Sequence, residues 1–428
     1  MLTIWGKAQQ FCDGVSRRDF VRVGALGTGL TLADIMRHRA MGAVRATGSK
    51  AKAAILIYLP GGPSHMDMYD LKPEAPKEFR GEFSPIPTNV PGLQISEHFP
   101  MQAKMFDKLA VVRSLVSVDE HSDSLVMTGF SEQTNKIMQH PSFGSVMSKI
   151  RSTGAGSDSV PPFVSLRGMS RGTEPGFLGV AHRPFTPGGP AMANLKPATA
   201  NTGFNLDARK DLLSGFDDLR RDIDASGTLA GIDTFTSRAF EMVTSGVVRE
   251  ALSNDKEAAS VRERYKGVES FLTARRLVEA GVSCVTLSIG GWDTHSNNFQ
   301  TLKKQLPQVD RGIANLVSDL HERGLDKDVA VVMWGEFGRT PKVNAQAGRD
   351  HWSPVMSALV AGGGLRMGQA VGSSTSRGER PKDRPYKVSN LLATLYNAMG
   401  IDPALTFQNG NGRPMYVLDD RDLVSELI

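Results

Sequence analysis

Residues 53–63 read AAILIYLPGGP, a seven-residue apolar run followed at once by a Pro-Gly-Gly-Pro turn. Short apolar runs that end at turn residues are typical of strands buried on both faces of a sheet. The same pattern recurs at 109–115 (LAVVRSL), 282–289 (VSCVTLSI) and 328–334 (DVAVVMW). We therefore predict a central sheet built from these runs, with weaker strands at 162–166, 356–361 and 367–371.

Long helical patterns separate the predicted strands. From Phe299 onward, apolar side chains recur at steps of three and four residues, which predicts an amphipathic helix over 299–323. Strands joined through long helices run parallel, so we predict an α/β fold with a mostly parallel central sheet and helices on both faces. Further helices are expected at 207–225, 231–252, 256–280 and 388–399.

The chain of 428 residues has 40% hydrophobic and 22% charged residues, an ordinary globular composition. We expect residues 47–428 to form one α/β domain, because a sheet of this kind can organise a core of that size. Residues 153–205 are rich in Gly, Pro, Ser and Thr without a sustained period. Together with the helical patterns that follow, they predict a loop-rich and helical insertion at about 153–255.

The net charge of +5 belongs to the N-terminal segment. Residues 1–50 hold eight Lys and Arg against three Asp, a difference of +5, so the remainder of the chain is neutral. A neutral domain gives no support for nucleic-acid binding. The two cysteines, Cys12 and Cys284, exclude a disulfide framework and a cysteine-based zinc site.

Residues 16–22 read SRRDFVR and precede a short apolar stretch over 23–35. This resembles a twin-arginine export signal, which implies the twin-arginine export machinery as a partner and a periplasmic or extracellular location. The apolar stretch is shorter than the roughly 20 residues that span a bilayer as a helix. We expect a signal over 1–46, with a loose Ala-x-Ala site at 43–46; a leader retained as a membrane anchor is the alternative.

Unusual polar clusters follow the ends of the predicted strands. In a parallel sheet these strand ends lie on one edge, where open α/β folds bind ligands. Residues far apart in sequence are therefore expected to converge there. The clusters contain Asp67, His121, Asp293 with His295, and Glu336, and a further cluster with His351 follows shortly.

Asp293 and His295 lie two residues apart, so in an extended segment their side chains point the same way. A carboxylate paired with an imidazole suits a divalent metal such as zinc or manganese. By itself the triplet is more typical of a hydrogen-bonded loop pair than of a metal site. The repetition of acidic residues and histidines at the other strand ends favours a functional site.

Two other polar residues have two interpretations each. Ser64 follows two glycines and is either a nucleophile or the N-cap of a helix. Arg339 either binds a charged substrate oxygen through its planar guanidinium or pairs with a nearby acid. No phosphate-loop lysine pattern follows Gly61-Gly62, which argues against a phosphate loop.

Six segments together resemble the exported bacterial proteins known as domain of unknown function 1501, which are common in planctomycetes. The resemblance covers residues 53–425 and implies a relationship to the alkaline phosphatase and sulfatase superfamily. The segments are GGPSHMDMYDLKP, HSDSLVMTG, GGWDTHSNN, GEFGRTP, GRDHW and VSNLLATLYNAMGID.

The resemblance implies metal ligands at Asp293, His295 and His351, with Glu336 or Asp67 completing the set. Phe337 stands where the superfamily has a ligand histidine, and Gly61-Gly62 where it has a ligand aspartate. These departures favour a site for one divalent ion (zinc, manganese or calcium) over a two-metal phosphatase centre. The candidate catalytic residues are His121, Ser122, Ser64 and Arg339, with bound water as an alternative to the serines as the attacking group.

Two functions follow from these features. The first is an exported metal-dependent hydrolase of phosphate or sulfate esters, acting on a small molecule or a polysaccharide. The second is a non-catalytic envelope binding or assembly protein on the same fold, favoured by Phe337 and by the absence of the sulfatase Cys-x-Pro-Ser-Arg pattern. An oxidoreductase is disfavoured because no G-x-G-x-x-G turn follows the first strand.

Overall fold

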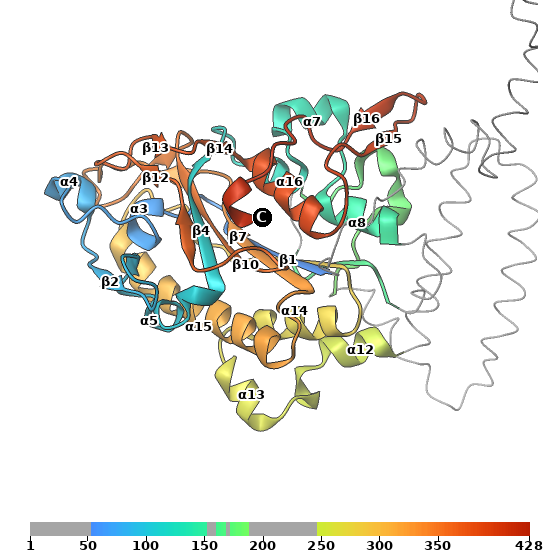
Figure 1. Ribbon diagram of the computed structural model, residues 1–428, viewed down its shortest axis with the longest axis horizontal. Coiled ribbons are helices and arrows are strands. Elements are labelled where there is room, and N and C mark those ends of the chain that lie inside the picture. Colours follow the sequence, from blue (N-terminus) through green and yellow to red (C-terminus); the bar gives the residue numbers. More distant parts are fainter. Residues whose placement is uncertain (1–52, 152–159, 168–171, 188–245) are drawn as a thin grey trace, which may run out of the picture.

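The computed structural model describes residues 53–151, 160–167, 172–187 and 246–428 (Figure 1). The predicted export signal over 1–46 lies outside the described residues. So do the predicted helix at 207–225, most of the helix at 231–252, and most of the predicted insertion.

The central sheet contains eight strands, and the apolar runs form its members as predicted. Their order is β11-β4-β10-β7-β1-β6-β5, with β14 pairing on β4 beside this path. All neighbouring pairs are parallel except those of β10, which runs antiparallel to both β4 and β7. The strands are β1 (Ala53–Tyr58), β4 (Leu109–Val116), β5 (Phe163–Ser165), β6 (Cys284–Ser288), β7 (Val329–Trp334), β10 (Met356–Gly362), β11 (Gln369–Val371) and β14 (Tyr386–Lys387).

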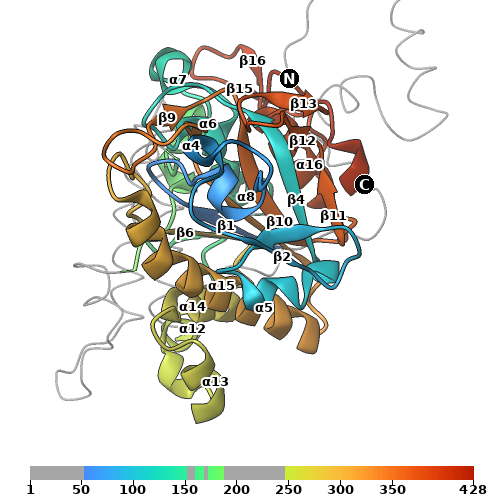
Figure 2. The same ribbon diagram turned by 90° about the vertical axis from the view of Figure 1, so that its left-hand side faces the viewer.

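Alternate side chains of β1 belong to two separate cores, because successive residues of a strand point to opposite faces of the sheet. Ile55 and Ile57 pack in the same core as side chains of α14 (Glu269–Glu279) and α15 (Asn298–Glu322). Leu56 lies in the other core with α8 (Phe143–Arg151) and α16 (Val388–Ala398). The two views show these helix pairs on opposite sides of the sheet, so the fold has three layers (Figures 1 and 2). This confirms the predicted fold class.

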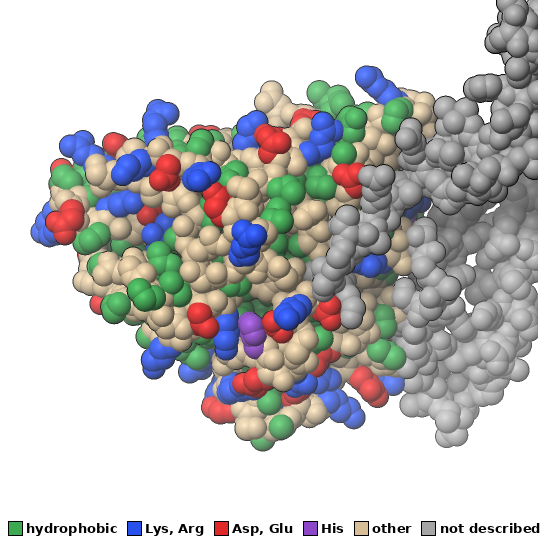
Figure 3. Space-filling model, viewed as in Figure 1, with side chains coloured by type: hydrophobic (Ala, Val, Ile, Leu, Met, Phe, Trp, Pro, Cys, Tyr) green, Lys and Arg blue, Asp and Glu red, His purple; other side chains and the backbone are tan. Residues whose placement is uncertain are grey.

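Short elements complete the described part of the chain. None of its helices has both the length and the apolar character needed to cross a bilayer. On the face shown in Figure 3, acidic and basic side chains are interspersed over the surface. The short helices are α3 (His65–Met68), α4 (Lys77–Arg80), α5 (Pro100–Ala103), α6 (Ser124–Thr128), α7 (Glu132–Met138), α12 (Val247–Leu252) and α13 (Ala259–Arg264), and the small two-stranded sheets are β2 (Pro85–Pro87) with β3 (Gln94–Ser96), β8 (Gly338–Arg339) with β9 (His351–Trp352), β12 (Ser373–Ser374) with β13 (Pro381–Asp383) and β15 (Thr406–Gln408) with β16 (Pro414–Tyr416).

The single helix predicted over 256–280 is wrong, because the structure divides it into α13 and α14. Gly267 between them has φ +84°, a left-handed conformation that ends regular helix and that glycine adopts without steric cost. Tyr265 is buried at the break, and its hydroxyl donates a hydrogen bond to Asp319 on α15 (2.9 Å). The chain therefore turns where Tyr265 is anchored to the neighbouring helix.

Candidate metal centre

Polar segments from five strands of the sheet meet at one edge. β1, β4, β6 and β7 share one direction, so the loops that follow them leave the sheet on the same side. β10 runs the opposite way, and the segment that precedes it therefore arrives at that same edge. This explains why His351, which comes before a strand, lies near Asp293 and Glu336, which come after strands.

Asp293, His295 and His351 direct three side-chain atoms toward one point. Asp293 Oδ1 lies 3.0 Å from His295 Nε2 and 3.1 Å from His351 Nε2, and the two nitrogens are 3.0 Å apart. Donor atoms bound to one tetrahedral zinc ion at about 2.0–2.1 Å lie about 3.3 Å from one another. The triangle thus has the dimensions of a divalent-cation site, and one carboxylate with two imidazoles fits zinc or manganese.

His121 stands on the other side of Asp293. Its Nε2 lies 3.6 Å from Asp293 Oδ2, and its Nδ1 lies 3.3 Å from Glu336 Oε1. Donor atoms of His121, Asp293 and His351 all lie within 4.8 Å of one another, a spacing that could also hold a cation. The side chain of His121 is half exposed, so solvent reaches the ring directly.

Glu336 is buried and lies beside His121. Its Oε1 accepts a hydrogen bond from the amide of Gly61 (2.8 Å). Burial raises the pKa of Glu336 above the ordinary range of a carboxyl group, although the hydrogen bond from Gly61 and the nearby imidazole act in the opposite direction. Glu336 therefore contacts the cluster from the protein interior, and His121 lies between it and Asp293.

Arg339 holds Asp293 in place and is fully buried. Its guanidinium donates to the carbonyls of Gly61 and Gly62, to the carbonyl of Arg349, and to Asp293 Oδ1. These contacts use the planar fork within the protein and expose none of it to solvent. Of the two sequence interpretations, the structure therefore favours pairing with a nearby acid over direct contact with a substrate oxygen.

The charge state of the triangle follows from these contacts. Partial burial acts to raise the pKa of Asp293, but hydrogen bonds from Arg339 and His351 outweigh it and lower that pKa to about 2. Burial also lowers the pKa of His351, against the opposing effect of its bond to Asp293. At neutral pH the cluster therefore offers an ionised carboxylate and a neutral imidazole, the forms that bind a metal ion.

Asp67 does not join this cluster. Both its oxygens accept hydrogen bonds from the buried Arg349, at 2.8 and 2.9 Å, and Asn298 donates to the same carboxylate (2.9 Å). The residue has no exposed surface. The expectation that Asp67 completes a metal site is corrected by this pairing, because its lone pairs already have partners within the protein.

Neither candidate serine is exposed. Ser122 Oγ accepts a hydrogen bond from the amide of Ser124 in the first turn of α6 (3.2 Å). Ser64 occupies the N-cap position of α3, as the second interpretation predicted, but its hydroxyl caps no amide and instead lines a small internal cavity with Ser357. Both serine side chains are therefore buried, and the Ser64 hydroxyl has no hydrogen-bond partner among the described residues.

Phe337 and Gly62 fill the space next to the cluster. The buried Phe337 ring packs against His351 and His121, with ring centroids 4.4 and 5.2 Å apart. A Cβ on Gly62 would lie 2.4 Å from the Phe337 ring, and one on Gly61 would lie 2.5 Å from the backbone nitrogen of Asp293. Neither glycine position has room for a carboxylate side chain, so in the described residues an aromatic ring and backbone occupy this side of the site.

Asp350 and Asn344 were missed as site residues, although Asp350 adjoins His351 in sequence. Asp350 Oδ1 lies 2.7 Å from His295 Nδ1, and Asn344 binds the carbonyl of His295 (2.9 Å). Asp119 also approaches the cluster, with Oδ1 3.9 Å from His351 Nδ1. The sequence could have indicated Asp350, because GRDHW places an acid next to His351. No sequence pattern indicated Asn344.

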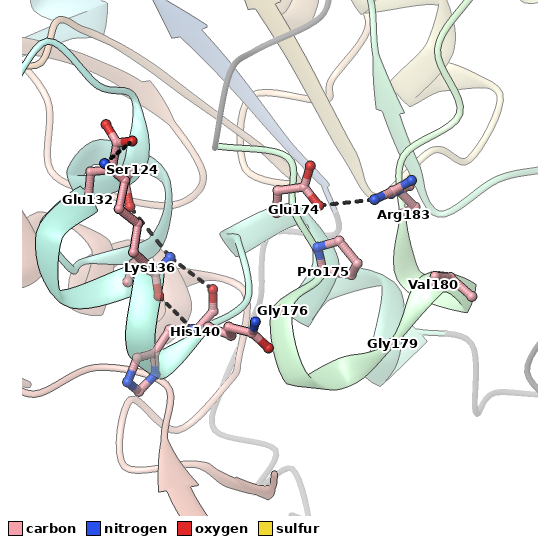
Figure 4. Close-up of a pocket in the computed structure, with 12 residues that line it drawn as sticks. Ser124, Glu132, Lys136, His140, Glu174, Pro175, Gly176, Gly179, Val180 and Arg183 are labelled. Carbon is pink, nitrogen blue, oxygen red and sulfur yellow. Dashed lines mark hydrogen bonds and ion pairs between the residues drawn. The ribbon is translucent and has the colours of Figure 1, made fainter. Parts of the chain in front are cut away.

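A separate pocket of about 350 Å³ lies between α7 and the segment over 174–183 (Figure 4). Its charged side chains are paired, Lys136 with Glu132 (3.2 Å) and Arg183 with Glu174 (3.1 Å). None of the residues that line it belongs to the Asp293 cluster. The pocket is therefore distinct from the candidate metal centre.

The described residues form a three-layer α/β fold with a cluster of carboxylate and imidazole groups at one edge of its sheet. The sequence model of the family described as "Protein of unknown function (DUF1501)" matches residues 51–428, and the chain belongs to this family. The family expected from the six sequence segments is thereby confirmed. None of the curated proteins compared with the chain matches it.

Several solved structures resemble the chain remotely, and likeness at this level concerns the fold alone. The lipoteichoic acid synthase LtaP from Listeria monocytogenes is 8% identical, with 90% of this chain and 81% of that chain covered and a TM-score of 0.34. The C-terminal periplasmic domain of EcEptC from Escherichia coli, in complex with Zn, is 10% identical, with 89% and 96% covered and a TM-score of 0.36. Ps i-CgsB is 12% identical, with 82% and 73% covered and a TM-score of 0.36.

Proposed function

We propose that the protein is a metal-dependent hydrolase of phosphate or sulfate esters that uses one divalent cation. The observation that carries the proposal is the triangle of Asp293 Oδ1, His295 Nε2 and His351 Nε2, whose sides measure 3.0–3.1 Å. Three protein ligands with an open fourth position are the usual arrangement of a catalytic zinc site. Zinc and manganese fit this donor set better than calcium, which prefers six or more oxygen ligands.

A cation held by these three side chains would polarise the ester and help to generate the attacking hydroxide. Water is the proposed attacking group because Ser64 and Ser122 are both buried. Its oxygen forms the new bond to phosphorus or sulfur, the bond to the ester oxygen breaks, and the departing alcohol takes up a proton. His121, half exposed beside Asp293, is the proposed proton acceptor, and Arg339 keeps the carboxylate of Asp293 ionised.

Phe337 supports a single ion rather than a pair. In a two-metal centre the ions lie about 3.5–4 Å apart and each needs its own carboxylates or imidazoles. Here the ring of Phe337 and the backbone of Gly61 and Gly62 fill the space beside the triangle. This is also the observation that favours the second function, a non-catalytic envelope binding or assembly protein that keeps the fold.

Metal analysis followed by assays separates the two functions. The purified protein is analysed for bound metal and then tested on nitrophenyl phosphate and nitrophenyl sulfate, each with added Zn²⁺ or Mn²⁺. We expect metal-dependent hydrolysis by the wild type and none by Asp293→Ala. Asp255→Ala, which alters an exposed aspartate outside the cluster, serves as the matched control and should retain activity. A wild type that binds no metal and hydrolyses neither ester contradicts the hydrolase and supports the second function.

We also propose that the protein is exported by the twin-arginine route, on the basis of residues 16–22. The test replaces Arg17 and Arg18 together by lysine and follows the protein by cell fractionation in a host with an active twin-arginine system. We expect the wild type outside the cytoplasm and the double variant inside it. Equal export of both proteins contradicts the proposal.

A further inference from the structure

His295 uses both ring nitrogens, and the two have different partners. Nδ1 lies 2.7 Å from Asp350 Oδ1, while Nε2 faces Asp293 and His351 at 3.0 Å. Ionised carboxylates only accept hydrogen bonds, and one faces each ring nitrogen. Asp350 is the nearer of the two, so it favours the tautomer of a neutral His295 that has the proton on Nδ1 and the lone pair on Nε2. We propose that Asp350 is a positioning residue that fixes this tautomer and aims Nε2 at the candidate metal centre. The inference rests on the proposed function only in assuming that Nε2 binds a metal ion.

The backbone and the carboxylate of Asp350 both have partners in the same loop. The amide of Asp350 donates to Thr340 Oγ1 (2.9 Å), and Thr340 donates its amide to the carbonyl of Asp350 (2.8 Å). Asn344 Nδ2 lies 3.4 and 3.5 Å from the two carboxylate oxygens while donating to the carbonyl of His295 (2.9 Å). Asn344 therefore contacts both Asp350 and His295.

Backbone hydrogen bonds join this loop to the segment that carries His295. The amide of Arg349 donates to the carbonyl of Thr294 (3.0 Å), and the amide of Asn298 donates to the carbonyl of Ala347 (2.9 Å). A Cβ on Gly348 would lie 2.0 Å from the carbonyl oxygen of His295, so only glycine permits this approach. The two segments are therefore locked in register, and Asp350 faces His295 as a consequence.

This pair contributes little to global stability. The side chains of His295 and Asp350 are 47% and 53% exposed. Exposed ion pairs stabilise proteins by only about 0–1 kcal/mol, because water solvates the separated charges and the side chains lose entropy when they pair. Removing the carboxylate should therefore leave the fold intact while freeing the ring to rotate and to change tautomer. The pair is thus suited to a positioning role that mutation can isolate.

Asp350→Ala tests the role in the metal-free protein first. The tautomer of His295 is read from its ring ¹⁵N chemical shifts by NMR at a pH where the ring is neutral. We expect protonated Nδ1 in the wild type and a shift of the population toward protonated Nε2 in the variant. Asp326→Ala is the matched control, because Asp326 Oδ2 faces His321 Nδ1 (3.7 Å) in another part of the chain. The control should leave the spectrum of His295 unchanged.

Zn²⁺ binding by isothermal titration calorimetry provides the second readout. Loss of a carboxylate that orients a ligand histidine costs about 10–100-fold in metal affinity, and we expect this loss for Asp350→Ala but not for Asp326→Ala. A variant that keeps protonated Nδ1 and wild-type affinity overturns the role of Asp350. A wild type that binds no Zn²⁺ but shows the Asp350-dependent tautomer contradicts the proposed function instead. In that case Asp350 still sets the tautomer of His295.

Discussion

Arg339 and Asp293 form a pair in which a fully buried guanidinium meets a carboxylate that is half exposed. The same guanidinium binds the carbonyls of Gly61 and Gly62, so the loop after β1 and the loop after β6 are joined through one side chain. Asp293 is thereby held at the rim of the sheet with its charge facing outward.

Arg339→Lys should weaken metal binding without unfolding the protein. Lysine keeps the charge but cannot reproduce the planar fork that binds three carbonyls and Asp293 together. We expect about a 10–100-fold loss of Zn²⁺ affinity by calorimetry, as is typical when the partner of a metal ligand is removed. Arg113→Lys, which alters a guanidinium that binds the carbonyl of Gln94 away from the cluster, should not change the affinity. Equal affinities for the two variants contradict the role of Arg339.

Gly61→Ala should disturb the site more than a comparable glycine change elsewhere. Gly61 has φ +101°, and its Cβ would lie 2.5 Å from the backbone nitrogen of Asp293. Gly92 has φ +81° and no atom within 4 Å of its would-be Cβ, so Gly92→Ala isolates the cost of the backbone conformation alone. That cost is about 1–2 kcal/mol of unfolding free energy. We expect a larger loss in chemical denaturation, and weaker metal binding, for Gly61→Ala; identical effects of the two changes contradict the close approach.

Arg349→Met should destabilise the fold strongly. It leaves the carboxylate of Asp67, which has no exposed surface, with only Asn298 as a side-chain partner. Breaking a buried ion pair from one side costs about 3–5 kcal/mol, since the remaining charge stays in a medium of low polarity. Lys303→Met removes an exposed pair with Glu82 and should cost less than about 1 kcal/mol. Urea denaturation measures both, and a small effect of Arg349→Met contradicts the structural role given to Asp67.

His65 should make the protein less stable as the pH falls below neutrality. Burial lowers the pKa of His65 below its ordinary value of 6.5, and Nε2 donates to the carbonyl of Gly378 (2.9 Å). Below pH 6.5 the unfolded chain binds a proton that the folded state resists. This contribution is therefore complete above pH 6.5 and is lost as the pH falls toward the folded-state pKa, with a slope of at most about 1.4 kcal/mol per pH unit.

His65→Gln provides the comparison, because glutamine can still donate to Gly378 but does not titrate. We expect the difference in unfolding free energy between wild type and variant to shrink between pH 7.5 and 5. A difference that stays constant over this range contradicts the assignment.

The sequence was sufficient to predict the sheet but not the details of the site. Runs such as 53–59 and 329–334 are apolar at every position because both faces of the sheet are covered, and this pattern is local. The helix break at Gly267 and the pairing of Asp67 with Arg349 depend on contacts with distant residues. Asp67 and Arg349 are 282 positions apart, so the local pattern around either residue cannot reveal the other.

The convergence of polar residues at this edge of the sheet was predictable from the sequence. Which side chains face the cluster was not. Strand direction alone brings the loops after β6 and β7 to one edge, which is why Asp293 and Glu336 lie near each other. Which acids face the cluster depends on side-chain packing. Glu336 turns into the interior beside Gly61, whereas Asp350 reaches His295 because Gly348 allows its loop to approach.

The most direct test is anomalous diffraction from crystals grown with Zn²⁺ or Mn²⁺, recorded at the absorption edge of the added metal. We expect one strong anomalous peak within coordination distance, about 2.0–2.2 Å, of Asp293, His295 and His351. No peak at saturating metal, or a peak bound only by residues elsewhere on the chain, would contradict it.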